Sequence, residues 1–382
     1  MENQFDSWHK VVNVREVASP ALLVYPDRIE ENIRRMIQMA GGTERLRPHV
    51  KTHKLAEVIR MQMEHGIAKF KCATVAEAEM TASCNAEDVL LAYQPVGPNV
   101  ERLVRLAKTF PNTKFSTIAD DAEPLRHLSA AASDAGVEIE VLLDIDCGMR
   151  RTGVAPGAKA VELYQLIEVL PALKSGGLHV YDGHINDREL SARVKNCEAV
   201  FAPVDALRKQ LADHVPKSSS GRHYGLSVLN VIAGGTPTFP IHARRKDVQC
   251  SPGTCILWDA GYATKLPDMN FLPAALLLTR VVSKPGANRL CLDLGHKAVA
   301  SENPHPRVEL LDLPDAKAVM HSEEHLVVET ARAEQFPVGT CLYGIPWHIC
   351  PTVALHSEAV VVRDGQAQGQ WAIMARARKL TT

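Results

Sequence analysis

The chain has 382 residues, of which 46% are hydrophobic and 23% are charged, a composition typical of a folded globular protein with more than one domain. Its net charge of −1 excludes the broad basic surface that binds nucleic acid or an anionic membrane, so an acidic substrate would have to be held by local groups. The longest apolar stretch, at 271–278, is short and contains Pro273, so we expect no membrane-spanning segment.

The N-terminal residues and the cysteines indicate a cytoplasmic protein. Residues 1–10 are polar and of mixed charge, and they lack the basic start and apolar core of a signal peptide. The nine cysteines are odd in number and include no Cys-x-x-Cys pair. This pattern argues against a disulfide framework and favours a reducing compartment.

From residue 21 to about residue 250, short apolar runs typical of buried strands alternate with amphipathic runs typical of helices. The first strand is expected at 21–25 and is followed by a helix at 28–39. Further helices are expected to begin at Thr74, where a capping box opens, and at Val100. The other strands are expected at 70–73, 89–92, 114–118, 139–146, 177–180 and 229–233. About seven or eight strand–helix units favour a closed parallel (β/α)8 barrel over an open sheet.

After residue 252 the sequence changes to strand-like runs separated by Gly, Pro and Asp turns, with few helical patterns. Strands are expected at 275–282, 289–293 and 358–362. We therefore predict an α/β barrel domain at 20–251 and a β domain at 252–382, which residues 1–19 complete.

The segment Arg47-Pro48-His49-Val50-Lys51-Thr52-His53-Lys54 ends an apolar-to-basic strand with a lysine among other bases. A lysine that forms a Schiff base must be partly neutral, and nearby cations or burial lower its pKa. Lys51 is therefore a candidate cofactor-binding lysine at a strand end, where barrel active sites lie. The alternative is a solvated basic surface.

Three turns after expected strands suit an anionic ligand. Gly234, Gly235 and Thr236 follow the strand at 229–233, and Gly253 and Thr254 follow the next expected strand. Their backbone N–H groups could form a nest for a phosphate, although such sequences are also ordinary turns. In the turn 148–153, Arg151 could bind a phenolate or a carboxylate, or could instead pair with Asp146.

His348 and Cys350 form an H-x-C pair near the C-terminal end. If the segment is extended, both side chains point to one face, and an imidazole and a thiolate could share one Zn²⁺ in an open site. The alternative is a buried histidine beside a structural cysteine.

Taken in order, these motifs and Ser19-Pro20-Ala21-Leu22-Leu23 resemble the D-threonine aldolase and D-serine dehydratase family, which are alanine-racemase-like, fold type III pyridoxal phosphate enzymes. The resemblance implies that Lys51 carries pyridoxal 5′-phosphate as a Schiff base, beside Lys54. It implies that Arg151 approaches the phenolic oxygen and that Tyr181 lies near the pyridine ring. The implied phosphate-binding residues are Gly234, Gly235, Thr236, Gly253 and Thr254.

The resemblance also implies that His348 and Cys350 bind a divalent metal, Zn²⁺, Mn²⁺ or Mg²⁺, and that the protein is a head-to-tail homodimer in which each active site is roofed by the partner's β domain. The implied substrate is a small D-β-hydroxy amino acid. A D-threonine-type aldolase would release glycine and an aldehyde, with His53 or His184 as the candidate base for the hydroxyl proton. The alternative is a dehydratase of D-serine or 3-hydroxyaspartate, which releases an α-keto acid and ammonia.

Two further functions are less well supported. A racemase would need a second base, for which Tyr262 or Tyr343 is available, but it would have no use for His348 and Cys350. A non-catalytic pyridoxal phosphate carrier resembles the barrel alone, and the residues after Pro252 argue against it.

Overall fold

The computed structural model describes residues 8–214 and 230–382. Residues 1–7 of the predicted β domain and Leu229 of the strand predicted at 229–233 therefore lie outside the described residues. The described chain forms two compact units. The first, which we call the barrel unit, comprises Arg35–Lys51, the described part of Ile59–Gly253, and Ala377–Thr382. The second, the β unit, comprises the described residues up to Arg34 together with Thr52–Val58 and Thr254–Arg376.

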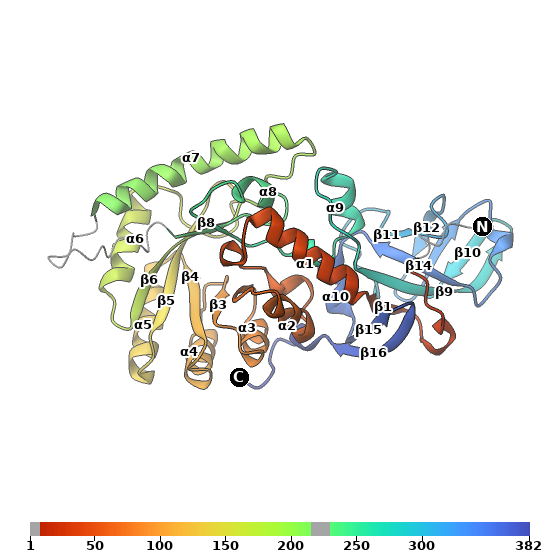
Figure 1. The fold of residues 1–382 in the computed structure, drawn as a ribbon, viewed down its shortest axis with the longest axis horizontal. Coiled ribbons are helices and arrows are strands. Elements are labelled where there is room, and N and C mark those ends of the chain that lie inside the picture. The colour runs from red at the N-terminus through yellow and green to blue at the C-terminus, as the bar shows by residue number, and fades with distance from the viewer. Residues whose placement is uncertain (1–7, 215–229) are drawn as a thin grey trace. The chain divides into compact units, whose positions relative to one another are not determined.

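The barrel unit is built on a parallel sheet with the strand order β2-β3-β4-β5-β6-β7-β8. The strands are β2 (Lys69–Cys72), β3 (Asp88–Leu91), β4 (Lys114–Ala119), β5 (Ile139–Ile145), β6 (Leu173–Val180), β7 (Val231–Ala233) and β8 (Val248–Cys250). The helices between them are α3 (Val75–Ser83), α4 (Asn99–Thr109), α5 (Ala122–Ala135), α6 (Ala158–Val169), α7 (Leu190–His214) and α8 (Phe239–His242). Helices α3 to α5 flank the strands from outside (Figure 1). Inside, Leu90, Ile118, Leu142 and Ile232 pack together in a buried cluster.

A short extended segment, Leu46 to His49, joins the two ends of this sheet. Leu46 is bridged to Cys250 of β8, and His49 is bridged to Lys71 of β2. The Arg47 N–H donates to the Cys250 carbonyl at 2.8 Å, and the Lys71 N–H donates to the Pro48 carbonyl at 2.9 Å. The segment takes the place of the eighth strand, and the predicted alanine-racemase-like (β/α)8 barrel is confirmed.

Capping interactions explain where several helices begin. The Thr74 hydroxyl accepts from the Glu77 N–H at 3.1 Å, and the Glu77 carboxylate accepts from the Ala73 N–H at 2.6 Å, so the capping box predicted at the start of α3 is confirmed. The Asp121 carboxylate caps α5 by accepting from the Glu123 N–H at 2.9 Å, and Gly136 ends that helix with φ of 65°.

The β unit contains a mostly antiparallel sheet in the order β12-β13-β10-β9-β1-β15-β16, with β14 pairing with β9 and β11. Its strands are β1 (Ala21–Val24), β9 (Ala275–Gly286), β10 (Arg289–Leu292), β11 (Val308–Leu310), β12 (Lys317–His321), β13 (Leu326–Glu329), β14 (Cys341–Pro346), β15 (Glu358–Arg363) and β16 (Gln366–Ala372). The helices are α9 (Ala260–Lys265) and α10 (Ile349–Leu355). Helices α1 (Pro26–Ala40) and α2 (Ala56–Glu64) each contribute residues to both units.

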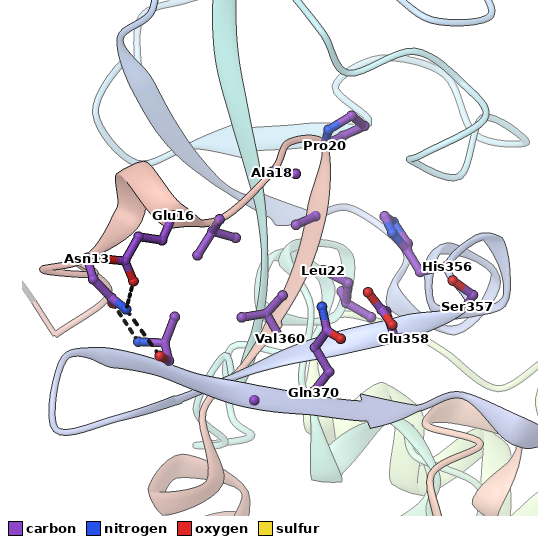
Figure 2. A pocket seen from close by; sticks show the side chains of 14 residues that line it. Asn13, Glu16, Ala18, Pro20, Leu22, His356, Ser357, Glu358, Val360 and Gln370 are labelled. Atoms are coloured by element: carbon purple, nitrogen blue, oxygen red, sulfur yellow. Dashed lines mark hydrogen bonds between the residues drawn. The ribbon is translucent and has the colours of Figure 1, made fainter.

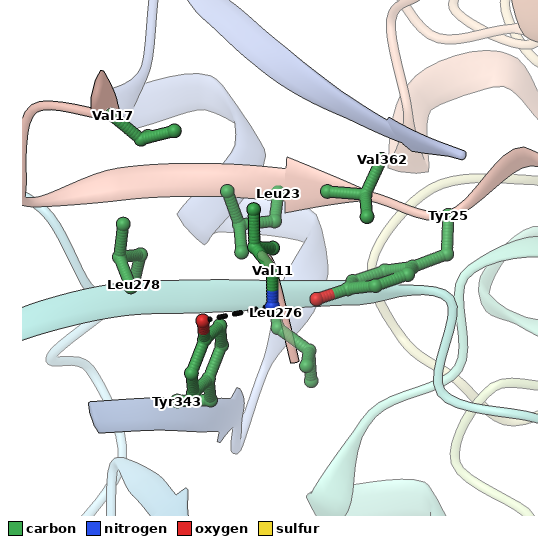
Figure 3. Packing of buried hydrophobic residues seen from close by; sticks show 8 residues of the cluster. All are labelled: Val11, Val17, Leu23, Tyr25, Leu276, Leu278, Tyr343 and Val362. Carbon is green, nitrogen blue, oxygen red and sulfur yellow. Dashed lines mark hydrogen bonds between the residues drawn. The ribbon is translucent and has the colours of Figure 1, made fainter. Parts of the chain in front are cut away.

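The strand predicted at 21–25 forms as β1, but the prediction that it belongs to the barrel is wrong. Leu23 pairs with Leu276 of β9 and with Val360 of β15, both in the β unit. Figure 3 shows Leu23 packed against Val11, Leu276 and Tyr343 in the apolar core of that unit. A four-residue apolar run buries itself equally well in either kind of sheet, so its composition does not identify its partners.

Candidate active site

The barrel unit gathers three basic side chains around one aromatic ring. Tyr181 directly follows β6, and its ring centroid lies 4.7 Å from the Arg151 guanidinium carbon. The Nζ atoms of Lys51 and Lys71 lie 6.0 Å and 5.7 Å from the same centroid. Lys51 stands in a 3-10 helix (Val50–Thr52) that directly follows the segment closing the barrel. The structure thus brings together Lys51, Arg151 and Tyr181, as predicted from sequence, and adds Lys71.

The turn that carries Arg151 is held by Asp146. The Asp146 carboxylate accepts from the Gly148 and Arg150 N–H groups at 2.9 and 3.0 Å. Asp146 therefore binds the backbone of the turn, while the Arg151 guanidinium lies against Tyr181.

His184 packs beside this turn. A Cβ at Gly148 would lie 3.1 Å from its Nε2, and its buried Nδ1 has no hydrogen-bond partner among the described residues. The predicted candidate base His184 thus lies beside the turn that carries Arg151.

The glycine turns lie against Tyr181 and against each other. Gly234 has φ of +70°, and a Cβ at Gly235 would lie 3.0 Å from Cε2 of Tyr181. The Gly253 N–H donates to the Thr236 hydroxyl at 3.3 Å. No side chain at position 235 would fit without moving the ring, so a glycine is needed for the backbone to pack against Tyr181. Thr254, the remaining predicted phosphate residue, belongs to the β unit, where its hydroxyl lies 3.5 Å from Cys350 Sγ.

A fully buried group beneath these turns consists of Asp182, Cys197 and His242, which we call the Asp182 cluster. His242 Nε2 lies 2.7 Å from the Asp182 carboxylate, and Cys197 Sγ lies 3.4 Å from Nε2 and 3.6 Å from the carboxylate. Ligand atoms around a tetrahedral zinc ion are about 3.3–3.7 Å apart, so the Asp182–His242 distance is that of a hydrogen bond and is too short for ligation.

Two more contacts support the same interpretation of the Asp182 cluster. A metal-bound histidine normally donates its other ring N–H to an acceptor, and His242 Nδ1 has no partner among the described residues. Asp182 also accepts from the Thr238 hydroxyl at 2.7 Å, next to the N-terminus of α8. The cluster therefore anchors α8 and the glycine turn that precedes it.

Sequence reasoning missed a buried polar chain formed by Lys71, His179 and Asp144. Lys71 Nζ lies 3.2 Å from His179 Nε2, and His179 Nδ1 lies 2.7 Å from the Asp144 carboxylate. Burial raises the pKa of Asp144, but the hydrogen bond from His179 outweighs it and lowers that pKa below its usual range. The available signal was Lys71 itself, since a lysine inside an apolar run predicted to be a buried strand needs an explanation.

In the β unit, His348 and Cys350 stand at the start of α10. His348 is the N-cap residue and has an extended backbone, with φ of −135° and ψ of 101°, but Cys350 lies in the first helical turn, so the prediction of an extended H-x-C segment is wrong at Cys350. Asp259 imposes this helix start, because its carboxylate accepts from the Ile349 N–H at 3.0 Å while also capping α9 through Tyr262 N–H at 2.8 Å. Although the backbone differs from the predicted strand, the two side chains still meet through a hydrogen bond.

The imidazole of His348 is oriented by an acidic neighbour. Its Nδ1 is hydrogen-bonded to Glu302, which leaves Nε2 for Cys350, and we call these three residues the His348 cluster. Burial lowers the pKa of His348, but the hydrogen bonds of Cys350 and Glu302 and the charges of Cys350 and Asp259 raise it to about 9. The Thr52 hydroxyl lies 3.2 Å from Cys350 Sγ. A carboxylate on one ring nitrogen and a thiol at the other form a donor set that fits a zinc-type ion.

The other predicted bases differ in their surroundings. His53 belongs to the β unit and is buried, and its Nδ1 accepts from the Leu55 N–H at 3.1 Å. Burial lowers its pKa to about 3, so the ring is neutral. Tyr343 lies in the core shown in Figure 3, where its hydroxyl accepts from the Val11 N–H at 3.1 Å. Tyr262 stacks on Trp258 with ring centroids 5.8 Å apart.

A separate cavity in the β unit contains none of the predicted site residues. It has a volume of about 460 Å³ and is lined by the N-terminal segment, β15 and β16. Figure 2 shows Asn13 at its edge, bonded to Glu16 at 3.1 Å and to the Ala367 carbonyl at 3.2 Å. Nothing in its lining resembles the cationic surroundings of Tyr181.

Comparison with known proteins identifies the family. Residues 24–224, more than half of the chain, match the alanine racemase N-terminal domain, and residues 274–362 match a putative serine dehydratase domain. The chain is 30% identical to a D-threonine aldolase from Arthrobacter sp., over 94% of this chain and 93% of that protein. It belongs to the D-threonine aldolase and D-serine dehydratase family of alanine-racemase-like proteins. Members of this family named among the relatives are lyases, and the chain is a pyridoxal phosphate-dependent lyase.

Two more relatives of this lyase family bear on its activity. A D-threo-3-hydroxyaspartate dehydratase from Delftia sp. is 25% identical over 92% of this chain and 96% of its own length. The crystal structure of a D-threonine aldolase from Filomicrobium marinum superposes with a TM-score of 0.83 at 29% identity, covering 94% of this chain and 96% of that one. Among the described residues, no helix is both long and apolar enough to cross a bilayer.

Proposed function

We propose that this lyase cleaves D-β-hydroxy amino acids as a D-threonine-type aldolase, with pyridoxal phosphate on Lys51 and a divalent metal on His348 and Cys350. The observation that carries the proposal is the convergence of Lys51, Arg151 and the glycine turns on Tyr181. This cluster occurs in a chain that is 30% identical to a D-threonine aldolase across 94% of its length.

The residues around Tyr181 fit this cofactor. The amine of Lys51 provides the point of attachment, and Arg151 supplies a cation for the phenolic oxygen. The turn Gly234-Gly235-Thr236, joined to Gly253, offers backbone donors to the phosphate. When bound, the cofactor ring accepts the electron pair released at the substrate's Cα.

The reaction requires one proton transfer at the substrate hydroxyl. A base removes that proton, the Cα–Cβ bond breaks, the Cβ–O bond becomes a carbonyl, and Cα later takes up a proton to give glycine. A metal held by His348 and Cys350 would acidify the hydroxyl as a Lewis acid. Each candidate base keeps one buried ring nitrogen without a partner among the described residues, Nδ1 in His184 and Nε2 in His53. We favour His184 because its ring lies beside the turn that carries Arg151.

A second function, dehydration of D-serine or 3-hydroxyaspartate, is supported by the likeness to the Delftia dehydratase and by the match to the putative serine dehydratase domain. It would use the same parts, with loss of the α-proton and departure of hydroxide. The aldolase is favoured because identity to the Arthrobacter aldolase, 30%, exceeds identity to that dehydratase, 25%. We further propose the head-to-tail homodimer that the family resemblance implies.

Product analysis tests the proposal. The purified protein is supplied with pyridoxal phosphate, with Zn²⁺, Mn²⁺ or Mg²⁺ in turn, and with D-threonine, D-serine or 3-hydroxy-D-aspartate. Release of glycine and an aldehyde is expected. Pyruvate, 2-oxobutyrate or oxaloacetate with ammonia would assign the dehydratase instead, and racemisation of the supplied amino acids without either kind of product would overturn both lyase functions.

A matched pair of variants tests the attachment point. Lys51→Ala should abolish the visible absorbance of the lysine-bound cofactor and lower kcat/KM by about 10³-fold or more, because covalent attachment and transfer both need the amine. Lys54→Ala, three residues away, should keep the absorbance. Borohydride reduction followed by peptide mapping should find the pyridoxyl group on Lys51, and finding it elsewhere would contradict the assignment.

A further inference from the structure

Lys71 is a buried lysine in the barrel that the reaction outlined above does not use. It lies on β2 between Phe70 and Cys72 and is 3% exposed. Its Nζ donates to the Ser251 hydroxyl at 2.8 Å and lies 3.2 Å from His179 Nε2. It is also 5.7 Å from the centre of the Tyr181 ring, so it faces the same space as Lys51. In barrels of this kind such inward positions are usually filled by branched apolar residues.

The hydrogen bonds of Lys71 engage only two of the three N–H donors of its ammonium group. With Asp144 ionised, His179 donates Nδ1–H to it, so His179 Nε2 is an acceptor. Lys71 therefore donates one proton to His179 and one to Ser251. An ammonium has three donors, and the third has no acceptor among the contacts of the described residues.

No carboxylate forms an ion pair with Lys71 in the part of the chain that the structure describes, although a buried cation normally has an anionic partner. Ser251 links it to the phosphate-binding side of the site, because the Ser251 N–H donates to the carbonyls of Ala233 and Gly234 at 3.0 and 3.2 Å. We therefore infer that the anionic partner of the Lys71 ammonium belongs to a ligand that binds beside the glycine turns.

We propose that Lys71 is a cofactor-binding residue, whose ammonium supplies the buried counter-charge for an anionic group of bound pyridoxal phosphate. The inference rests on the proposed function, because it assumes that this cofactor occupies the space around Tyr181. His179 and Asp144 are then positioning residues that hold Lys71, since they act through it and lie farther from Tyr181.

The protonation of Lys71 makes the contribution depend on pH. Burial, and next the charge of Lys51, lower the pKa of Lys71 to about 7 in the protein without cofactor. A bound anion raises that pKa, so the Lys71 contribution to affinity is complete below about pH 7 and is lost as the pH rises through the higher pKa of the complex. The charged and titratable groups that act on Lys71 are Lys51, Asp144, Arg151, His179 and Asp182.

Binding of pyridoxamine 5′-phosphate to the cofactor-free protein, measured by calorimetry from pH 6 to 9, tests this without any activity assay. This probe cannot form a Schiff base, so Lys51 chemistry does not enter. Lys71→Met should weaken binding roughly 10- to 100-fold at pH 6.5. The wild-type advantage should shrink as the pH rises above 7, whereas Lys71→Arg should retain its affinity at pH 8.5 because arginine stays charged.

The control is Lys69→Met, two residues earlier on β2, where the lysine is half-buried at the start of the strand and contacts the Glu44 carbonyl at 3.4 Å. It should bind the probe as the wild type does. Lys71→Gln, which keeps a donor for Ser251, replaces Lys71→Met if the latter does not fold. Binding within twofold of wild type by both variants at every pH would overturn the inference.

Two further arms identify the anionic group and separate this inference from the proposed function. Binding of pyridoxamine, which lacks the phosphate, and of inorganic phosphate, which lacks the ring, is measured with the wild type and with Lys71→Met. The probe that binds more weakly to Lys71→Met carries the anionic group that Lys71 contacts. If Lys51→Ala binds the probe but the pyridoxyl group is found on Lys71 in the wild type, the proposal that Lys51 is the attachment point fails. If neither the wild type nor Lys51→Ala binds pyridoxamine 5′-phosphate, the proposal that pyridoxal phosphate occupies this site fails.

Discussion

The molecule contains two clusters made of the same three residue types, a carboxylate, a histidine and a cysteine, and they differ in almost every physical property. The Asp182 cluster in the barrel unit is fully buried, and its members bond to one another and to Thr238. In the His348 cluster of the β unit, the side chains of His348 and Glu302 are 41% and 47% exposed.

The difference shows that the hydrogen bonds made by the histidine decide whether a carboxylate, a histidine and a cysteine can bind a metal. In the Asp182 cluster the carboxylate binds the same nitrogen, Nε2, that a metal would need, and Nδ1 has no partner among the described residues. In the His348 cluster the carboxylate binds Nδ1, which leaves Nε2 for Cys350. The first arrangement stabilises a fold, and the second fits a metal.

The sharpest way to break this comparison is to remove His348. His348→Ala should lower kcat/KM by roughly a hundredfold or more if, as proposed, a metal held there acts as a Lewis acid at the hydroxyl, an effect worth several kcal/mol. The visible absorbance of the lysine-bound cofactor should remain, as the barrel unit is untouched. His325→Ala, an exposed histidine of the same unit, is the control. Full activity of His348→Ala, or of the wild type after EDTA treatment, would refute a metal role for the His348 cluster.

Asp182→Asn tests the other cluster. Breaking the buried Asp182–His242 pair should lower the free energy of unfolding by about 3 kcal/mol, measured by urea denaturation at pH 7. Asp27→Asn, at a carboxylate that is 72% exposed, should change it by less than about 0.5 kcal/mol.

The same variant has a pH signature. Burial raises the pKa of Asp182, but the hydrogen bond and charge of His242 lower it below the usual value. Its contribution to stability is therefore present above the ordinary aspartate pKa, about 4, and is lost as the pH falls through the lower folded value. The difference in free energy of unfolding between wild type and Asp182→Asn should therefore become smaller at acid pH. A difference that does not change with pH would mean that the Asp182–His242 pair contributes no charge interaction.

The absorption spectrum of the Co²⁺-loaded protein tests which of the two clusters binds a metal. Co²⁺ bound by a thiolate gives a near-ultraviolet charge-transfer band. We expect the band in the wild type, its loss in Cys350→Ser, and its retention in Cys197→Ser. The reverse pattern would move the metal to the Asp182 cluster.

The smallest expected effect is that of Cys197→Ala. Removing this thiol deletes two weak hydrogen bonds at 3.4 and 3.6 Å and leaves a small cavity, which should cost about 1 kcal/mol of stability. Its kcat/KM should equal that of the wild type. A large loss of activity with intact stability would show that the Asp182 cluster takes part in the reaction.

The sequence predicted the barrel because its strand–helix alternation is regular, and barrel topology then brings distant strand ends together. The expectation that Arg151 and Tyr181, 30 positions apart in the chain, approach one cofactor came from the family resemblance, and in the structure the two side chains pack together. Sequence reasoning missed Lys71, because period-two alternation alone does not show which side chains face the barrel interior, and the signal of a lysine within an apolar run was not used. It misassigned the partners of β1 and the backbone of Cys350, because strand partners and helix caps depend on residues such as Leu276 and Asp259 far along the chain.

The segment that closes the barrel has a consequence for how the protein acquires its cofactor. Bridges at Leu46 and His49 replace a regular ladder, so this seam is a place where local opening should cost less free energy than elsewhere in the sheet. Lys51 lies two residues beyond it. A ligand attached there stabilises the closed state by mass action, so loading the cofactor and sealing the barrel become one coupled equilibrium. Slower exchange of the Arg47 and His49 amides, which donate to Cys250 and Pro252, would then record each step of loading.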